Sequence, residues 1–135
     1  MAESAAGKDS MSSVEQITAV VREYVSRLTT GTSTEIAALY AEDATVEDPV
    51  GGEVRRGRDA LAAFYGPLDA VDNSAELLVI RVSGSSAAFH MRVTTTTHEQ
   101  VIIVEPIDVM TFDADGHITS MRAFYNPADI VTTAR

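Results

Sequence analysis

The sequence contains no cysteine, which excludes both a disulfide framework and a thiolate metal site. It is also poor in basic residues: ten Lys and Arg stand against 20 Asp and Glu, and the formal net charge at pH 7 is -10. A chain of this charge lacks the basic patches that nucleic acids and anionic membranes require, so neither is an expected partner. The charge instead favours a small neutral or cationic ligand.

Long hydrophobic runs are missing as well. The apolar runs are a few residues long, far short of a membrane span, and the N-terminal stretch has no apolar core of a secretory signal. We therefore expect a cytoplasmic protein. Its 135 residues, 45% of them hydrophobic, are sufficient for one domain with its own core. Residues 1–12, rich in Ser, Ala and Gly, predict a flexible N-terminal extension, and residues 13–135 predict a single domain.

Three helices are predicted in the first half of the chain. The first begins at a capping serine near residue 13, carries an apolar stripe at helical spacing and ends at Gly31. The second begins at Thr32 and runs through about Ala41. The third covers Arg58–Tyr65 and is closed by a Gly-Pro pair.

Strand patterns dominate the second half. The stretch ATVEDPV, residues 44–50, predicts a first strand that proline and two glycines terminate. Four later segments, rich in β-branched and aromatic residues, are predicted strands: Ala75–Val82, Ala87–Thr97, Val101–Phe112 and Ile118–Tyr125. Helices followed by antiparallel strands indicate an α+β fold. We expect a curved antiparallel or mixed sheet packed against three N-terminal helices, forming a cone with one open end.

One aspartate in ATVEDPV lies in an unexpected place. Asp48 is two residues from Val46, and in a strand such residues face the same side, so the carboxyl is expected to point toward an apolar interior. An aspartate before a proline is equally typical of a turn, so a structural role stays open here.

A second aspartate follows the same rule. In VIIVEPIDVMTF, the strand period places Asp108 on one face with Val104, Pro106, Met110 and Phe112. Aspartate is disfavoured in the middle of a strand, so a functional role is favoured. A shifted register or an edge position facing water is the alternative. Neither aspartate has a Lys or Arg on its own strand to pair with.

Burial of an unpaired carboxyl disfavours the charged form and raises its pKa. A carboxyl whose pKa rises far stays neutral at pH 7 and donates a hydrogen bond. One whose pKa rises only slightly stays ionised and accepts a proton. Two interior carboxyls in different surroundings therefore predict a base and an acid within one site.

Four tyrosines can join this site. Tyr24 lies in the apolar stripe of the first helix, Tyr40 and Tyr65 end the second and third helices, and Tyr125 ends the last strand. Each alone is typical of a core tyrosine bonded to a carbonyl, but four beside two interior carboxyls favour a polar cluster in an apolar cavity. The three histidines are not spaced as ligands, and no metal site is predicted.

Five segments carry a family resemblance. TAVVREYV, IAALYAEDATVEDPVG, ALAAFYG, EPIDVMTFDADGHI and SMRAFY lie in this order between Thr18 and Tyr125. In them the sequence resembles bacterial ketosteroid isomerase, with TVEDPVG and PIDVMTF the most specific matches. The resemblance implies a nuclear transport factor 2-like, cystatin-like fold and usually a homodimer. It also implies isomerisation of a Δ5-3-ketosteroid to the conjugated Δ4 isomer without a cofactor.

The resemblance also implies roles for single residues. Asp48 matches the general base that moves a proton from C4 to C6. Tyr24 and a protonated Asp108 match the oxyanion hole that binds the C3 oxygen of the dienolate; this family is the standard example of a carboxylic acid kept neutral at pH 7. Tyr40 and Tyr65 match tyrosines that extend the hydrogen-bond network in some members.

The predicted substrate is a small apolar steroid. Tyr125 matches an aromatic residue that lines the steroid pocket, and Phe89 and Met91 are further candidates for the lining. Ile107 and Val109 face away from the predicted cleft, and we expect this outer face to meet a second copy in a dimer.

Two other functions remain open, because one fold hosts many activities. A related hydrolase or cyclase would act on another apolar polycyclic substrate. Epoxide hydrolysis would need an Asp–Arg–Asp arrangement around water, and no inward-facing arginine is predicted: Arg92 and Arg122 lie on the faces opposite Met91 and Tyr125. A non-catalytic steroid-binding or protein-interaction module is the second alternative, but the set of three catalytic matches is complete.

Overall fold

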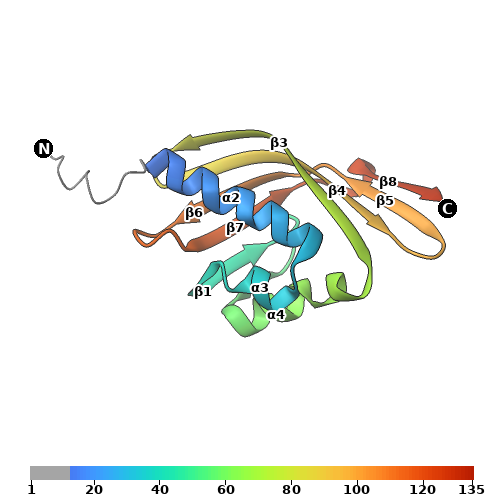
Figure 1. The fold of residues 1–135 in the computed structure, drawn as a ribbon, viewed down its shortest axis with the longest axis horizontal. Helices are drawn as coiled ribbons and strands as arrows, with labels where there is room; N and C mark the ends of the chain where they lie inside the picture. Colours follow the sequence, from blue (N-terminus) through green and yellow to red (C-terminus); the bar gives the residue numbers. More distant parts are fainter. Residues whose placement is uncertain (1–12) are drawn as a thin grey trace, which may run out of the picture.

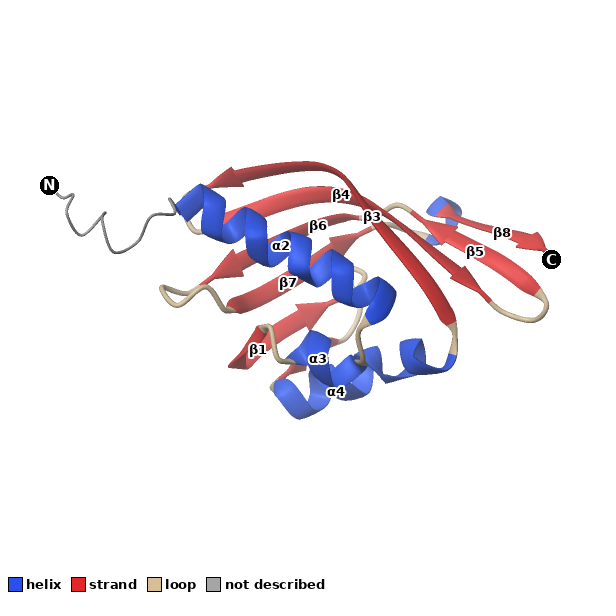
Figure 2. Ribbon diagram, viewed as in Figure 1, coloured by secondary structure: helices blue, strands red, loops and turns tan. Residues whose placement is uncertain are grey.

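The structure, a computed structural model, describes residues 13–135, and one curved sheet organises them. The sheet wraps around a long helix, as Figures 1 and 2 show. The predicted flexible extension, residues 1–12, lies outside the described residues. No helix within 13–135 has the length and apolar character that crossing a bilayer requires.

The helical segments lie mostly in the first half of the chain. Their bounds are α2 Ser13–Thr30, α3 Ser33–Ala37, α4 Arg58–Tyr65, and the two 3-10 turns η1 Gly66–Ala70 and η2 Pro127–Asp129. The buried side of α2 follows the predicted stripe, with Ile17, Val21, Tyr24, Val25 and Leu28. At the start of α3, Thr32 and Glu35 form a reciprocal capping box, which explains why a helix begins there.

Among the described residues, eight strands form one mixed sheet. Their bounds are β1 Tyr40–Glu47, β2 Val54–Arg56, β3 Asp72–Ser83, β4 Ser86–Thr96, β5 Gln100–Val104, β6 Ile107–Phe112, β7 Ile118–Phe124 and β8 Ile130–Ala134. The strand order is β2-β1-β7-β6-β4-β5-β8, and β3 pairs with the other edge of β4. Only β1 and β7 run parallel, so the predicted mixed α+β arrangement is confirmed.

The layers place the core beneath α2. This helix crosses the concave face of the sheet, while α3 and α4 lie together near β1 (Figure 2). Alternate residues of β4, β6 and β7 point inward and are buried, among them Phe89, Met110 and Met121. The β5–β8 pair extends beyond this core at the end where the chain terminates (Figure 1).

The second helix is shorter than predicted. It was expected to run through about Ala41, but α3 ends at Ala37 and Tyr40 is already the first residue of β1. The reason is tertiary: Tyr40 pairs with Ile118 of β7, and the Ile118 amide donates to the Leu39 carbonyl at 3.0 Å. Strand pairing has overridden the local helical pattern.

The predicted strand Val101–Phe112 is two strands. β5 ends at Val104 and β6 begins at Ile107. Proline at position 106 has no N–H to donate to a ladder, so the strand is interrupted there. The two halves then pair differently, β5 with β8 and β6 with β7, although both pair with β4.

Two strands were not predicted, and the predicted range of another lies a few residues too far toward the C-terminus. β2 and β8 are short and largely exposed, without the alternation that identifies a half-buried strand. The first strand was expected at residues 44–50, whereas β1 ends at Glu47, so Asp48 lies in the turn beyond it.

Candidate active site

Three tyrosine hydroxyls form a hydrogen-bonded chain in the interior. Tyr65, the last residue of α4, bonds Tyr24 of α2 at 2.9 Å and Tyr40 of β1 at 2.7 Å, measured between hydroxyl oxygens. All three side chains are buried. Burial is the main reason that the pKa of each phenol is raised well above its usual value, so all three are protonated donors.

Asp108 is completely buried in the middle of β6. It points inward with Met110 and Phe112, as the strand period predicted, and none of its surface is exposed. Among the described residues, neither carboxyl oxygen has a hydrogen-bond partner. Burial, and next the negative charge of Asp48, raise the pKa of Asp108 well above its ordinary value. This carboxyl is therefore suited to stay protonated and to donate a hydrogen bond.

Asp48 is held in a different environment. It follows Glu47 in a turn that the Val50 amide fixes by donating to the Ala123 carbonyl of β7 at 2.8 Å. The hydroxyl of Tyr125, just after β7, donates to Asp48 Oδ1 at 2.7 Å. Burial raises the pKa of Asp48, while this hydrogen bond and the positive charge of Arg55 act in the opposite direction.

A cavity of about 280 Å³ joins these groups. Its polar members are Tyr24, Asp48, Tyr65, Asp108 and Tyr125. The rest of its lining is apolar: Leu28, Phe64, Leu68, Met91, Val93, Val104 and Pro106. A few convergent polar groups within an apolar cavity are typical of a site for a small apolar ligand that carries one polar group.

The predicted residues do not all lie in this lining. Tyr40 is not a lining residue, but its hydroxyl bonds that of Tyr65, which lines the cavity. Phe89 was expected in the lining, but it packs edge-on against Tyr24 with ring centroids 6.3 Å apart and is not among the lining residues. Phe89 pairs directly with the lining residue Asp108, but its ring packs against that of Tyr24, which lines the cavity in its place. Met91, two residues further along β4, lines the cavity.

An inward-facing arginine was not predicted, and the structure contains one. Arg55 in β2 pairs with the buried Val46 of β1, and directly paired residues share a face. Its guanidinium carbon lies 4.6 Å from the ring centroid of Phe64, which lines the cavity. β2 carries no periodic pattern, so only the short Gly-Gly turn before it hints at a hairpin.

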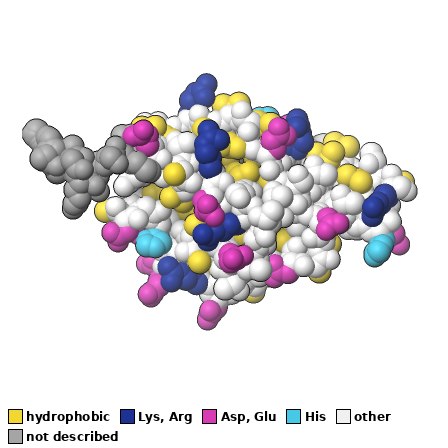
Figure 3. Space-filling view, viewed as in Figure 1, with side chains coloured by type: hydrophobic (Ala, Val, Ile, Leu, Met, Phe, Trp, Pro, Cys, Tyr) yellow, Lys and Arg dark blue, Asp and Glu magenta, His cyan; other side chains and the backbone are white. Residues whose placement is uncertain are grey.

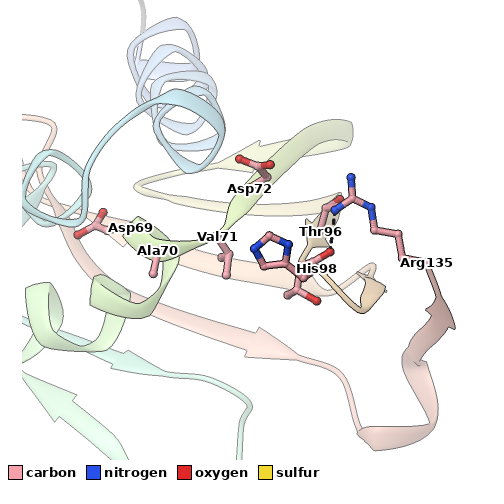
Figure 4. A pocket seen from close by; sticks show the side chains of 8 residues that line it. Asp69, Ala70, Val71, Asp72, Thr96, His98 and Arg135 are labelled. Carbon is pink, nitrogen blue, oxygen red and sulfur yellow. Dashed lines mark hydrogen bonds between the residues drawn. The ribbon is translucent and has the colours of Figure 1, made fainter.

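Two other parts of the surface lack a set of convergent functional groups. A polar hollow of about 300 Å³ lies between the start of β3 and the β4–β5 turn, with His98 and Arg135 at its edge (Figure 4). One of its carboxylates, Asp69, is already bonded to the Ser33 amide and hydroxyl. On the face in Figure 3, basic side chains are scattered among acidic ones. Neither the hollow nor this surface brings together side chains suited to catalysis.

The β6–β7 turn brings three potential metal ligands together. Ligand atoms of Asp113, Asp115 and His117 lie within 4.8 Å of one another. Asp113 Oδ1 accepts the backbone N–H groups of Asp115 and His117 at 3.0 and 2.9 Å, which is ordinary turn stabilisation. The three side chains are therefore close together because the turn is formed, and their proximity gives no separate support for a metal site.

The cavity can perform acid–base chemistry on carbon. An ionised carboxylate at one wall can accept a proton, and two neutral donors at another can bind an oxygen that gains negative charge. An apolar lining lowers the local dielectric around bound substrate, which strengthens both effects.

Comparisons with known proteins identify the family of this chain. A SnoaL-like domain model matches residues 21–121. A steroid Delta-isomerase of Nocardioides simplex is 53% identical over 118 residues, which cover 87% of this chain and 96% of that protein. The family match and the structure together confirm the predicted fold class.

More distant relatives are epoxide hydrolases. Epoxide hydrolase LasB of Streptomyces lasalocidi is 26% identical over 82% of this chain, which spans 48% of LasB. Among solved structures, the epoxide hydrolase/cyclase-like enzyme SalBIII, studied for pyran ring formation in the polyether salinomycin, superposes with a TM-score of 0.81. It is 28% identical and covers 87% of this chain and 95% of its own.

Proposed function

The chain belongs to the SnoaL-like family and, within it, to the steroid Delta-isomerase group, and we propose that it isomerises Δ5-3-ketosteroids to their conjugated Δ4 isomers. The observation that carries the proposal is the pair of unequal carboxyls in one apolar cavity. Among residues 13–135, Asp108 has no hydrogen-bond partner, and the charge of Asp48 raises its pKa further. Asp48 accepts a hydrogen bond from Tyr125, and the charge of Arg55 opposes the rise of its pKa. A base and a neutral acid are the two groups that enolisation requires.

The proposed reaction moves one proton within the substrate. Asp48 takes the C4 proton, and the electrons of that C–H bond move toward the C3 oxygen to give a dienolate. Asp48 then returns the proton to C6, which restores the carbonyl and conjugates the double bond with it. Tyr125 donates to Oδ1 of Asp48, and no other described residue bonds Oδ2, so Oδ2 is the oxygen proposed to carry the proton.

Tyr24 and Asp108 are proposed to bind the C3 oxygen. Both line the cavity, and burial is the main cause that raises the pKa of both, which favours the protonated form. Tyr65 and Tyr40 support Tyr24 through the hydroxyl chain. The apolar lining, with Met91 and the other side chains given above, receives the steroid rings.

The test uses a Δ5-3-ketosteroid such as 5-androstene-3,17-dione and follows the ultraviolet absorbance of the conjugated enone. We expect turnover by the wild-type protein and a loss of at least about 10²–10⁴-fold for Asp48→Asn, which keeps the shape but removes the proton acceptor. Steroid affinity should change little, because Asn preserves the packing. An Asn variant with more than about a tenth of the wild-type rate would remove Asp48 from the role.

Epoxide hydrolysis is a weaker candidate. The relatives LasB and SalBIII and the inward position of Arg55 favour it. Against it, no hydrogen bond or ion pair joins Arg55 to Asp48 or Asp108 among the described residues, so no arginine connects two carboxylates around a water. Incubation with an apolar cyclic epoxide, followed by analysis for the diol, separates the two activities.

A homodimer is proposed through the outer face of the sheet. Ile107 and Phe124 pair across β6 and β7 on that face, and 45% and 41% of their surfaces are exposed. Val109 continues the apolar surface along β6. An exposed apolar sheet face of this kind is typical of an interface, and a second copy placed by two-fold symmetry would cover both surfaces at once.

A further inference from the structure

Two carboxyls share one cavity, and the reaction needs a negative charge on only one of them. Burial alone would raise the pKa of both. Two neighbouring carboxyls in similar surroundings would share the charge between them, and part of the protein would carry it on the wrong residue. Asp108 is the more deeply buried of the two, and Tyr125 donates to Asp48 only, so a nearby cation would add to an existing difference.

Arg55 lies where it can do this. It faces inward from the edge strand β2, opposite Val46, two residues before Asp48 in the chain. Its guanidinium lies over the ring of Phe64, 4.6 Å from the centroid, so the cation is stacked on a wall of the same cavity. Its side chain is 29% exposed, and its only ion pair among the described residues is with the largely exposed Glu53 at 3.6 Å.

The charged and titratable groups around the two carboxyls are unevenly arranged. Asp48 faces the Tyr125 hydroxyl from the end of β7 and the Arg55 cation from β2, and both oppose the effect of burial on its pKa. Its own charge raises the pKa of Asp108 in β6 and of Tyr24 in α2. Arg55 is not among the causes of the shift at Asp108, which has only burial and Asp48.

We propose that Arg55 is a positioning residue that keeps the negative charge of the carboxyl pair on Asp48 and leaves Asp108 as the neutral member. The stacking on Phe64 holds the guanidinium against a residue that lines the cavity together with Asp48. The role of Asp48 as the base rests on the proposed function, but the distribution of charge between the carboxyls does not. The two claims can therefore be tested separately.

The direct test is a pH titration by ¹³C NMR of protein with carboxyl-labelled aspartate. The resonance lost in Asp48→Asn identifies the Asp48 carboxyl. In Arg55→Met we expect its titration to move to higher pH, and in Arg55→Lys, which keeps the charge, to return most of the way. Arg56→Met is the matched control: it removes an arginine from the same strand whose guanidinium bonds the Asp43 carbonyl outside the cavity, and it should leave the Asp48 titration unchanged.

Activity gives a second readout. The acid limb of kcat/KM for Δ5-3-ketosteroid isomerisation should move to higher pH in Arg55→Met. At pH values on the acid limb, kcat/KM should fall by about three- to tenfold, and on the plateau above it by less than about twofold. A uniform loss at every pH would indicate a structural role and overturn the proposal. So would an Asp48 titration that is the same in Arg55→Met and Arg56→Met.

Two controls keep the outcome decisive. Arg55→Gln repeats the titration with a planar polar head if Met disturbs the edge strand, and urea unfolding verifies that each variant is folded. If the wild-type protein fails to isomerise steroids, the proposed function is wrong, yet the NMR titration still supports or refutes the role of Arg55.

Discussion

Replacing Asp108 by Asn is expected to stabilise the protein at neutral pH. The carboxyl is fully buried, and neither oxygen has a hydrogen-bond partner among the described residues. In the unfolded chain the same group is ionised at pH 7, because an aspartate in water has a pKa of about 3.9. Because the pKa of Asp108 is raised in the folded state, folding at pH 7 is coupled to proton uptake, which costs free energy that an amide side chain does not require.

The sign and size of the effect follow from the raised pKa. Above the ordinary pKa the folded state binds more protons than the unfolded state, so the stability of the wild type falls as the pH rises. Each pH unit costs about 1.4 kcal/mol until the raised pKa is reached. Between the ordinary value of about 3.9 and pH 7 the ceiling is therefore about 4 kcal/mol. Burying the amide without partners costs about 1–3 kcal/mol, as burying the neutral acid does, so these terms largely cancel.

The assay is urea unfolding of the wild type and the variant at several values between pH 4.5 and about pH 8. The free energy of unfolding of Asp108→Asn minus that of the wild type should grow with pH. Asp108→Leu is the control: it also lacks a titrating group, so its difference from the wild type should have the same slope, whatever its offset. A difference that is flat, or that falls with pH, would mean that Asp108 is ionised in the folded protein and would refute the reasoning.

Three further predictions concern activity and assembly. Asp108→Ala should lower kcat by about 10²–10³-fold while Asp108→Asn retains much of it, because Asn keeps a donor; equal and severe losses would contradict the neutral-donor role. Tyr125→Phe removes the hydroxyl that lowers the pKa of Asp48, so the acid limb of kcat/KM should move to higher pH, and an unmoved limb would count against this contact. Ile107→Glu should dissociate a dimer in sedimentation velocity; a wild-type protein that sediments only as a 14.4 kDa species at micromolar concentration would contradict the proposed interface.

The buried polar residues that follow a local period were placed correctly by sequence. Tyr24 lies on the buried stripe of α2, and Asp108 lies on the inward face of β6 with Met110. Both positions depend only on the repeat of a helix or a strand, which a short sequence segment contains. Asp48 lines the cavity as expected, but for a different reason: the pairing of its turn with β7 aims it inward, not the strand period.

Features that depend on pairing between distant segments were not predictable. Tyr40 begins a strand because it pairs with Ile118, although its local sequence favours a helix. Arg55 lies on the same sheet face as the buried Val46 because β2 pairs with β1, and nothing in VRR itself indicates a strand or a face. The substrate, the dimer, the single-domain boundary and the cytoplasmic location stay predictions.

The number of protons in the chain of three tyrosine hydroxyls limits which hydroxyl donates to which. Three hydroxyls hold three protons, and the two links from Tyr65 to Tyr24 and Tyr40 use two of them. If Tyr24 donates its proton into the cavity, Tyr65 must donate to Tyr24 and Tyr40 must donate to Tyr65, so that all three O–H dipoles point the same way. Dipoles aligned in this way polarise one another. Negative charge that develops at Tyr24 is therefore stabilised in part by the hydroxyl of Tyr40, the first residue of β1, which lies two hydrogen bonds away.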